Sequence, residues 1–229
     1  MQQLPLHIEL KTDATFENFV AGDNASLVGQ LKSIAQNHSD FLYISGSSGS
    51  GKSHLLQALT QSFSHLNPNK LVAYLPLDDT SLMPGMLHGL SGFDCICLDN
   101  IHCVIGNDEW ELAIFDLYNQ LKEHSKSLII TANESPMFLS VKLADLKSRL
   151  SAMLIYSVKD LVDEDKKALL FKKAEDKGLE LSEDAANFLL TREQRDLSSL
   201  VAAIDKLDRA SLQAKRKITI PFIKTVLGH

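Results

Sequence analysis

Hydrophobic positions follow two different periods along the chain. In the first part, short apolar runs rich in strand-favouring residues alternate with amphipathic stretches. These runs predict strands at residues 41–45, 71–75, 94–99, 127–131 and 153–157. Strands that alternate with helices are typical of a parallel sheet that is covered by helices on both faces.

Helical spacing of apolar residues predicts the helices between these strands. The apolar positions of the clearest helix are spaced three or four residues apart: Trp110, Ile114, Leu117 and Leu121. Asn107 or Asp108 can cap its N-terminus, because a side-chain oxygen there accepts backbone N–H bonds. A second helix, which carries Leu55, Leu59 and Phe63, is expected after a glycine-rich turn that follows the first strand, and a short third helix at residues 143–150.

The pattern changes to purely helical periods from about residue 160. Helices are expected at residues 165–177, 182–192 and 196–215, followed by a short helix that Pro221 opens. The sequence therefore predicts an α/β domain at residues 12–159 and an all-helical lid domain at residues 160–229. Residues 1–11 precede the α/β domain as a separate tail.

Composition narrows the classes of function. The 229 residues carry a net charge of −6. A protein that mainly grips bulk nucleic acid normally presents a basic face, because phosphate contacts supply most of its affinity. No apolar run approaches the roughly 18 residues that cross a bilayer, and the N-terminus lacks the basic and apolar parts of a signal peptide. We therefore expect a cytoplasmic protein.

Three cysteines are too few for a disulfide framework. Cys95 and Cys97 lie two positions apart in an apolar run, so that on a strand they point the same way, and Cys103 follows. No second pair of ligands stands at the spacing of a zinc site. We expect all three to be buried core thiols.

A glycine-rich segment follows the first strand. Residues 46–53, Gly-Ser-Ser-Gly-Ser-Gly-Lys-Ser, fit the phosphate-binding P-loop pattern G-x-x-x-x-G-K-[S/T]. The glycines allow backbone N–H groups to surround a phosphate, Lys52 can neutralise it, and the hydroxyl of Ser53 can bind Mg²⁺. The residues predicted to contact nucleotide here are Gly46, Gly49, Ser50, Gly51, Lys52, Ser53 and His54.

The third strand ends in a carboxylate. Residues 95–99, Cys-Ile-Cys-Leu-Asp, have the pattern of a Walker B motif, and Asp99 is expected at the crevice edge of the sheet, where it can help to hold Mg²⁺. The next residue is Asn100, and an amide cannot accept a proton from an attacking water near neutral pH. The site therefore favours holding a nucleotide over cleaving it.

Three further polar residues are candidates for phosphate contacts. Asn133 follows the fourth strand and is expected near the γ-phosphate region, although a simple turn residue would fit the same position. Arg149 closes the short helix before the fifth strand, and Arg195 opens the long lid helix. A guanidinium suits phosphate through its planar fork and permanent charge. Spacing alone does not distinguish these arginines from surface residues.

The order of these motifs resembles a known family. Residues 16–24, Phe-Glu-Asn-Phe-Val-Ala-Gly-Asp-Asn, resemble the segment that opens the ATPase module of the bacterial replication initiator DnaA. The P-loop, Leu-Asp-Asn, Leu-Lys-Ser-Arg-Leu and Gln-Arg-Asp-Leu follow in that family's order, over about residues 12–229. The resemblance implies an AAA+ P-loop fold with a parallel sheet, flanking helices and a helical lid.

Residue roles follow from this resemblance. Val20 is implied to line the base pocket, and Asn133 to be the sensor 1 residue. Arg195 matches sensor 2, which contacts the chain's own nucleotide. Arg149 matches the arginine finger, which acts on ATP held by a neighbouring subunit.

A DnaA-like ATPase module without the initiator's helix-turn-helix domain resembles the Hda family of DnaA regulators. This resemblance implies a negative regulator of replication initiation that holds ADP and Mg²⁺ and stimulates hydrolysis of DnaA-bound ATP. Its implied partners are DnaA and the DNA-loaded sliding clamp (the polymerase III β subunit). Self-association through the arginine-finger edge is left open.

The first residues resemble a clamp-binding peptide. Hda proteins carry Gln-Leu-x-Leu-Pro-Leu, and residues 3–6 here read Gln-Leu-Pro-Leu. Gln3, Leu4 and Leu6 are thereby implied to bind the clamp. The match keeps either the opening or the closing part of the peptide, so its register stays open.

Two other classes of function compete with this one. An autonomous ATPase of the helicase-loader type would hydrolyse ATP rapidly without a partner, against the expectation from Asn100. A nucleic-acid-binding module would bind duplex DNA tightly, against the expectation from the net charge.

Overall fold

A computed structural model describes residues 10, 12–192, 197–214 and 218–228. The chain forms two compact units. The α/β unit ends at Val158 and the helical unit begins at Lys159, and residues 48–50 group with the helical unit. Of the helices in these described ranges, none is both long and apolar enough to cross a membrane.

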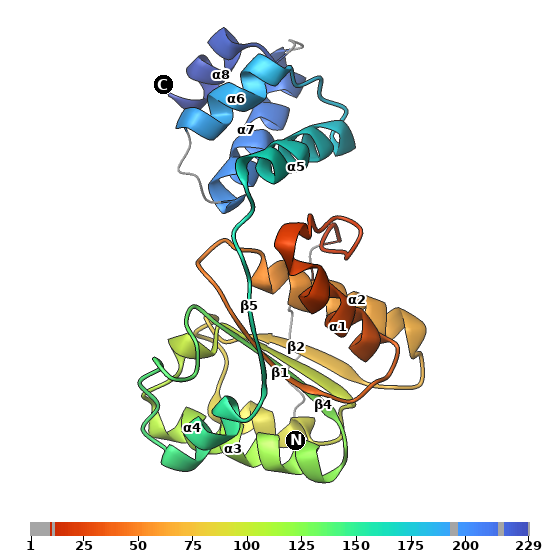
Figure 1. The fold of residues 1–229 in the computed structure, drawn as a ribbon, viewed down its shortest axis with the longest axis vertical. Coiled ribbons are helices and arrows are strands. Elements are labelled where there is room, and N and C mark those ends of the chain that lie inside the picture. The colour runs from red at the N-terminus through yellow and green to blue at the C-terminus, as the bar shows by residue number, and fades with distance from the viewer. Residues whose placement is uncertain (1–9, 11, 193–196, 215–217, 229) are drawn as a thin grey trace. The chain divides into compact units, whose positions relative to one another are not determined.

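A five-stranded parallel sheet forms the centre of the α/β unit (Figure 1). Its strands are β1 (Phe41–Ser45), β2 (Val72–Pro76), β3 (Cys95–Asp99), β4 (Ser127–Ala132) and β5 (Leu154–Ser157). Their spatial order is β2-β3-β4-β1-β5. The predicted fold class, a parallel sheet flanked by helices and followed by a helical lid, is confirmed.

Helices cover both faces of this sheet. Helices α1 (Ala25–Ala35) and α2 (Lys52–Leu66) lie on one face, and α3 (Asp108–Glu123) and α4 (Ala144–Ser151) lie on the other (Figure 1). Three short 3₁₀ helices lie in the connections: η1 (Gly22–Asn24), η2 (Pro84–Leu90) and η3 (Ile101–Cys103). The sequence patterns considered above did not predict α1, although its buried positions Leu27, Leu31 and Ile34 have helical spacing.

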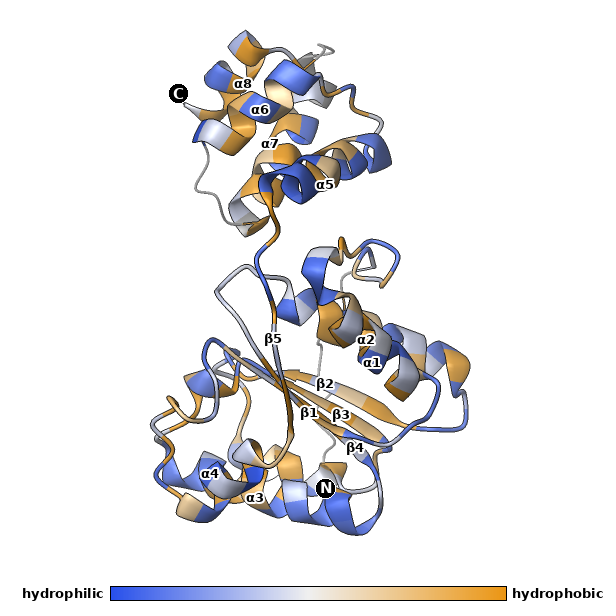
Figure 2. Ribbon diagram, viewed as in Figure 1, coloured by the Kyte–Doolittle hydropathy of each residue, from blue (hydrophilic) through white to orange (hydrophobic). Residues whose placement is uncertain are grey.

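The strand side chains divide between two hydrophobic clusters, one on each face. Tyr43 belongs to the cluster with α3 and α4, whereas its neighbours Leu42 and Ile44 belong to the cluster with α1 and α2. The hydropathy colouring shows the apolar strands between amphipathic helices (Figure 2). The edge strand β5 differs, since its Leu154 and Ile155 are exposed.

The cysteine prediction is correct for two residues and wrong for the third. Cys95 and Cys97 are buried in the same hydrophobic cluster, as their spacing on a strand predicts. Cys103 is exposed, because the chain has left the sheet and this residue lies at the end of η3. Partial burial, with the nearby carboxylates of Asp78 and Asp99, raises the pKa of the Cys103 thiol.

The helical unit contains α5 (Asp163–Asp176), α6 (Glu183–Arg192), α7 (Leu197–Ala214) and α8 (Ile220–Leu227). Their apolar faces form a third cluster, which includes Leu189, Leu200 and Ile204. The Thr219 side chain caps α8 by accepting the backbone N–H of Phe222. Pro221 thus lies near the start of this helix, where a missing N–H costs little.

Of the two predicted caps of α3, the structure selects Asn107. Its side-chain oxygen accepts the backbone N–H groups of Glu109 and Trp110, at 3.0 and 3.2 Å. We expect Asn107→Ala to lower the free energy of unfolding by about 1 kcal/mol, whereas Asn107→Asp, which keeps the acceptor, should retain most of it. Urea titration followed by the fluorescence of Trp110 measures both. Equal stability of the alanine variant and the wild type would contradict the capping role.

Candidate functional site

Three neighbouring strands carry the predicted site residues to one edge of the sheet. The P-loop follows β1, Asp99 ends β3, and Asn133 follows β4, which pairs with both of the others. Because the strands are parallel, their carboxyl ends lie at the same edge, and this edge is where α/β proteins commonly bind ligands.

Two glycines of the P-loop adopt backbone conformations that other residues avoid. Gly49 has φ 75° and Gly51 has φ 98°. A Cβ atom at Gly51 would also lie 2.8 Å from Cε2 of Phe19, so that a side chain there would collide with the ring. The loop is therefore restricted to glycine at this point by both its backbone and its packing.

Lys52 is held against its own loop. Its side chain is buried, with 5% exposed, and its Nζ donates hydrogen bonds to the carbonyl oxygens of Gly46 (2.6 Å) and Ser47 (2.7 Å). These bonds hold the ammonium against the backbone of the loop. A phosphate oxygen offers the same ammonium a charge-assisted bond, which is the stronger kind.

The loop also contains a buried hydroxyl without a partner. Ser50 is buried, and its Oγ forms no hydrogen bond with the described residues. A buried polar atom that lacks a partner is costly, and in native proteins it usually has a ligand or water nearby. No side chain caps the N-terminus of α2, whose helix dipole favours an anion at the same place. These features fit a phosphate group.

Asp99 is oriented by two hydroxyl groups that the sequence patterns did not identify. It is 1% exposed, and its Oδ2 accepts a hydrogen bond from the Tyr74 hydroxyl at 2.7 Å. Its Oδ1 accepts a hydrogen bond from the Thr131 hydroxyl. Burial and the adjacent carboxylate raise the pKa of Tyr74, which keeps this hydroxyl a proton donor. A carboxylate that hydroxyl groups hold in one orientation fits a role in binding Mg²⁺.

The same network extends to Asn100. The Asn100 backbone N–H donates to Oγ1 of Thr131 at 2.9 Å, and the residue lies in the left-handed region with φ 59°. Asparagine tolerates this conformation better than most residues. The left-handed backbone conformation at Asn100 thus restricts which residues can follow Asp99.

Asn133 contacts a histidine that the sequence patterns also missed. The amide Nδ2 of Asn133 lies 2.8 Å from Nε2 of His102, in η3. Burial and the positive charge of Lys52 lower the pKa of His102, which favours the neutral imidazole. In that form the ring nitrogen can accept the amide N–H. Nothing in the sequence spacing distinguishes His102 from a surface residue.

The segment before α1 lies against the start of α2. His54 forms a 2.8 Å hydrogen bond with the carbonyl oxygen of Thr15, and its ring packs 5.7 Å from the Phe19 ring. The His54 side chain therefore contacts this segment. Val20, the predicted base-pocket residue, is partly buried next to Phe19. These contacts hold the segment with Thr15 and Phe19 against the first turn of α2, next to the P-loop.

Arg149 lies on α4, on the other face of the sheet from α2 (Figure 1). Its side chain is exposed, and its Cζ lies 5.8 Å from the centroid of the Tyr118 ring. It forms no ion pair with a carboxylate in the described ranges.

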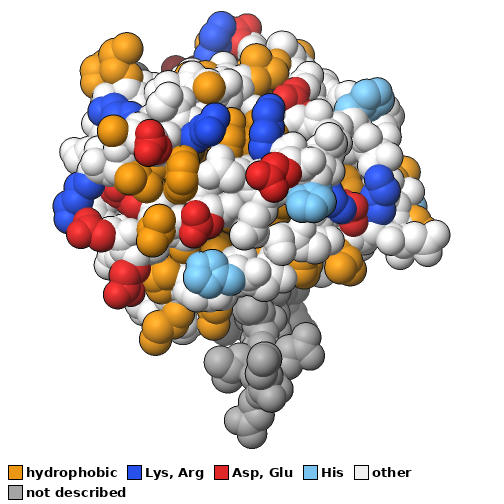
Figure 3. Space-filling view, turned by 90° about the horizontal axis from the view of Figure 1, so that it is seen from below, with side chains coloured by type: hydrophobic (Ala, Val, Ile, Leu, Met, Phe, Trp, Pro, Cys, Tyr) orange, Lys and Arg blue, Asp and Glu red, His pale blue; other side chains and the backbone are white. Residues whose placement is uncertain are grey.

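Acidic, basic and apolar side chains are mixed on the face of the molecule shown in Figure 3.

Four predicted site residues lie outside the described residues. They are the sensor 2 candidate Arg195 and the three clamp-binding candidates Gln3, Leu4 and Leu6. Their roles stay predictions.

Comparison with known proteins agrees with this architecture. Residues 10–157 match the family described as the bacterial DnaA ATPase domain, and residues 163–227 match the Hda lid domain. An uncharacterized protein of Haemophilus influenzae is 47% identical over 99% of each chain. The crystal structure of domain III of Thermotoga maritima DnaA superposes with a TM-score of 0.86, at 25% identity, over 96% of this chain and 98% of that one.

More distant structures share the fold. DnaA of Aquifex aeolicus bound to AMPPCP superposes with a TM-score of 0.73, at 20% identity, over 89% of this chain and 68% of that one. Fold and site together define an AAA+ P-loop protein. Within that class, the chain belongs to the family of the bacterial DnaA ATPase domain. Its lid further makes it a DnaA-related, Hda-like protein.

The contacts of Lys52 generate a prediction for nucleotide binding. We expect Lys52→Ala to abolish ADP binding, because the β-phosphate loses its only lysine partner in a cradle otherwise made largely of backbone. Isothermal titration calorimetry with ADP measures the loss. Lys122→Ala, which removes an exposed lysine from α3, is the control and should bind as the wild type does. Affinity of Lys52→Ala within twofold of the wild type would mean that the P-loop is not the binding site.

Proposed function

We propose that this protein is a negative regulator of replication initiation that switches off DnaA. In this proposal it holds ADP and, bound to the DNA-loaded sliding clamp, stimulates hydrolysis of the ATP carried by DnaA. The observation that carries the proposal is the combination of a DnaA-type ATPase unit with an Hda-type lid in one chain. Such a module can pair with a DnaA ATPase unit in the way that AAA+ subunits pair with one another.

Nucleotide binding is supported by the fit of the site. The P-loop, the unpartnered Ser50 hydroxyl and the N-terminus of α2 together suit a diphosphate. Solved DnaA relatives bind the ATP analogue AMPPCP. Ser53 and Asp99 would hold Mg²⁺, which bound nucleotide brings as a counter-charge for its phosphates. Val20 and the neighbouring segment would line the base pocket, and Arg195 would contact the nucleotide from the lid.

Weak hydrolysis by the protein itself is supported by Asn100. Its amide cannot remove a proton from water at neutral pH. A regulator that stays loaded with the product of hydrolysis needs no turnover of its own.

Arg149 is the residue that would act on the partner. It is exposed and lies on α4, whereas the P-loop precedes α2 on the opposite face. An arginine in this arrangement can reach the ATP of a neighbouring subunit. An arginine finger stabilises charge that develops on the transferred phosphoryl group and can be worth roughly 10³–10⁵ in rate.

The finger role predicts a selective loss. We expect Arg149→Ala to keep ADP and clamp binding but to lose stimulation of ATP hydrolysis by DnaA, and Arg149→Lys to rescue only in part, because an ammonium lacks the planar fork. Single-turnover hydrolysis of labelled ATP on DnaA, with clamp and DNA present, measures the effect. Lys122→Ala, which removes an exposed positive charge from α3, controls for net charge. Full stimulation by Arg149→Ala would remove the mechanism from the proposal.

The proposed clamp-binding tail predicts a loss of clamp binding that leaves ADP binding intact. Replacing Gln3, Leu4 and Leu6 together with alanine should remove clamp binding, since these residues supply the anchors of the proposed clamp peptide. ADP affinity should be unchanged. Co-elution of the triple variant with the clamp on size-exclusion chromatography is the test, and elution identical to that of the wild type would refute the assignment.

A further inference from the structure

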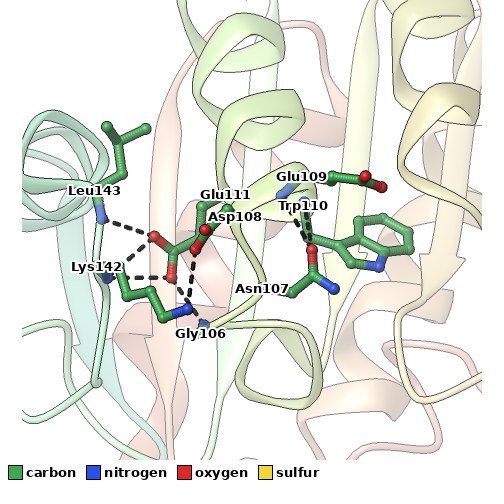
Figure 4. Close-up of polar contacts among 8 residues, drawn as sticks. All are labelled: Gly106, Asn107, Asp108, Glu109, Trp110, Glu111, Lys142 and Leu143. Carbon is green, nitrogen blue, oxygen red and sulfur yellow. Dashed lines mark hydrogen bonds and ion pairs between the residues drawn. The ribbon is translucent and has the colours of Figure 1, made fainter.

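A buried carboxylate lies between the helix α3 and the loop that leads into α4. Glu111 is in the first turn of α3, and only 1% of its surface is exposed. A carboxylate is rarely buried unless other groups satisfy its charge and lone pairs. Figure 4 shows what satisfies it, with Gly106 on one side and the backbone of Lys142 and Leu143 on the other.

All the hydrogen bonds drawn to this carboxylate come from backbone N–H groups. Oε1 accepts from Gly106 at 2.8 Å and from Lys142 at 3.2 Å. Oε2 accepts from Lys142 at 3.0 Å and from Leu143 at 2.7 Å. Glu111 therefore joins three separate segments: the turn after η3, the helix α3 and the start of α4. Bonds to an ionised acceptor are the stronger kind of hydrogen bond.

The start of α4 depends on this arrangement. Leu143 is the N-cap residue of α4, and no side chain of its own segment caps the helix. A helix N-terminus carries N–H groups without partners in the helix and a partial positive charge. A carboxylate at that end satisfies both needs, and here it is supplied from another helix.

The face of α3 that carries Glu111 also meets the far end of α4. Ile114 follows Glu111 by three residues and Tyr118 follows it by seven, which places the three side chains on one face of the helix. Leu146 and Leu150 of α4 are buried in the same cluster as Ile114 and Tyr118. Arg149 lies over the Tyr118 ring. Helix α4 is thus held at its N-cap by Glu111 and along its length by this face.

We propose that Glu111 is a positioning residue for Arg149, acting through the backbone at the start of α4. The proposal rests on the finger role proposed above for Arg149. A group that must stabilise a transition state loses most of its effect when it is displaced by about 1 Å, which can cost on the order of 10²-fold in rate. Loss of the Glu111 carboxylate releases the start of α4 and allows such a displacement.

The decisive comparison is Glu111→Gln against Asp108→Asn. Both changes remove one negative charge from the first turn of α3, and both alter a group that contacts Lys142. Asp108 is the matched control because its ion pair among the described residues is with the exposed Lys142 ammonium, at 3.0 Å. In Glu111→Gln, one acceptor oxygen remains and the other is replaced by an NH₂ group. This NH₂ group cannot accept the backbone N–H bonds that the second carboxylate oxygen accepts in the wild type.

Three measurements on the full-length protein decide the proposal. Hydrogen exchange of the Lys142 and Leu143 amides should be faster in Glu111→Gln and unchanged in Asp108→Asn. Stimulation of DnaA-bound ATP hydrolysis should fall on the order of 10²-fold in Glu111→Gln alone. ADP affinity should match the wild type in both variants, because the P-loop lies on another element.

The double variant Glu111→Gln/Arg149→Ala separates positioning from general destabilisation. If Glu111 acts through Arg149, the double variant stimulates no less than Arg149→Ala alone, which is a non-additive result. Additive losses, unchanged amide exchange, or a parallel loss of ADP affinity would each overturn the proposal. If Glu111→Gln does not fold, Glu111→Asp keeps the charge but withdraws it by one methylene, and it should show an intermediate loss; wild-type stimulation by this variant would then be the overturning result.

Failure of this inference can be told apart from failure of the proposed function. Should Arg149→Ala stimulate fully, the finger role fails, and the positioning role fails with it, whatever the exchange data show. Should Arg149→Ala be inactive while Glu111→Gln stimulates as the wild type does, only the positioning role is overturned.

Discussion

Parallel pairing of β1, β4 and β3 is the constraint on which the site depends. Hydrogen bonding between neighbouring parallel strands fixes their register, so that Ser45 lies opposite Ala132 and Leu98 opposite Ile130. The residues that follow each strand must then emerge side by side. The P-loop, the Walker B carboxylate and Asn133 lie far apart in sequence, and the sheet alone brings them to one edge.

At this edge of the sheet, two hydroxyl groups hold the Asp99 carboxylate in one orientation. Tyr74 comes from β2 and Thr131 from β4, and both donate to Asp99 between them. The Thr131 oxygen also accepts the Asn100 backbone N–H, and Gln57 of α2 reaches the Tyr74 hydroxyl at 3.3 Å. Strands on either side of β3, and the helix that follows the P-loop, therefore share one hydrogen-bond network. Movement of any one of them alters the carboxylate at its centre.

Much of this arrangement could be predicted from sequence, because it depends on local patterns. The strands, the P-loop and the cap of α3 are each encoded within a few residues, and the strand limits differ from the prediction by no more than one residue at either end. The supporting residues could not be predicted in the same way. Tyr74, His102 and Glu111 each have a partner in a segment more than 20 residues away, and nothing in the adjacent sequence marks that partner. The exposure of Cys103 could not be predicted either, because the strand was correctly expected to end at Asp99 but nothing in the sequence marks the exposed side of η3.

The left-handed backbone at Asn100 has a consequence for how this protein could change over evolution. Asparagine and aspartate have nearly the same shape, and both tolerate this region of backbone space. Replacing the amide by a carboxylate would therefore leave the backbone and its bond to Thr131 undisturbed, while placing a proton acceptor beside Asp99. Most other side chains would strain the chain at this point. Under the proposed function, a single amide-to-acid exchange at residue 100 thus separates a site that stores nucleotide from one that has a proton acceptor, and the backbone accommodates the exchange in either direction.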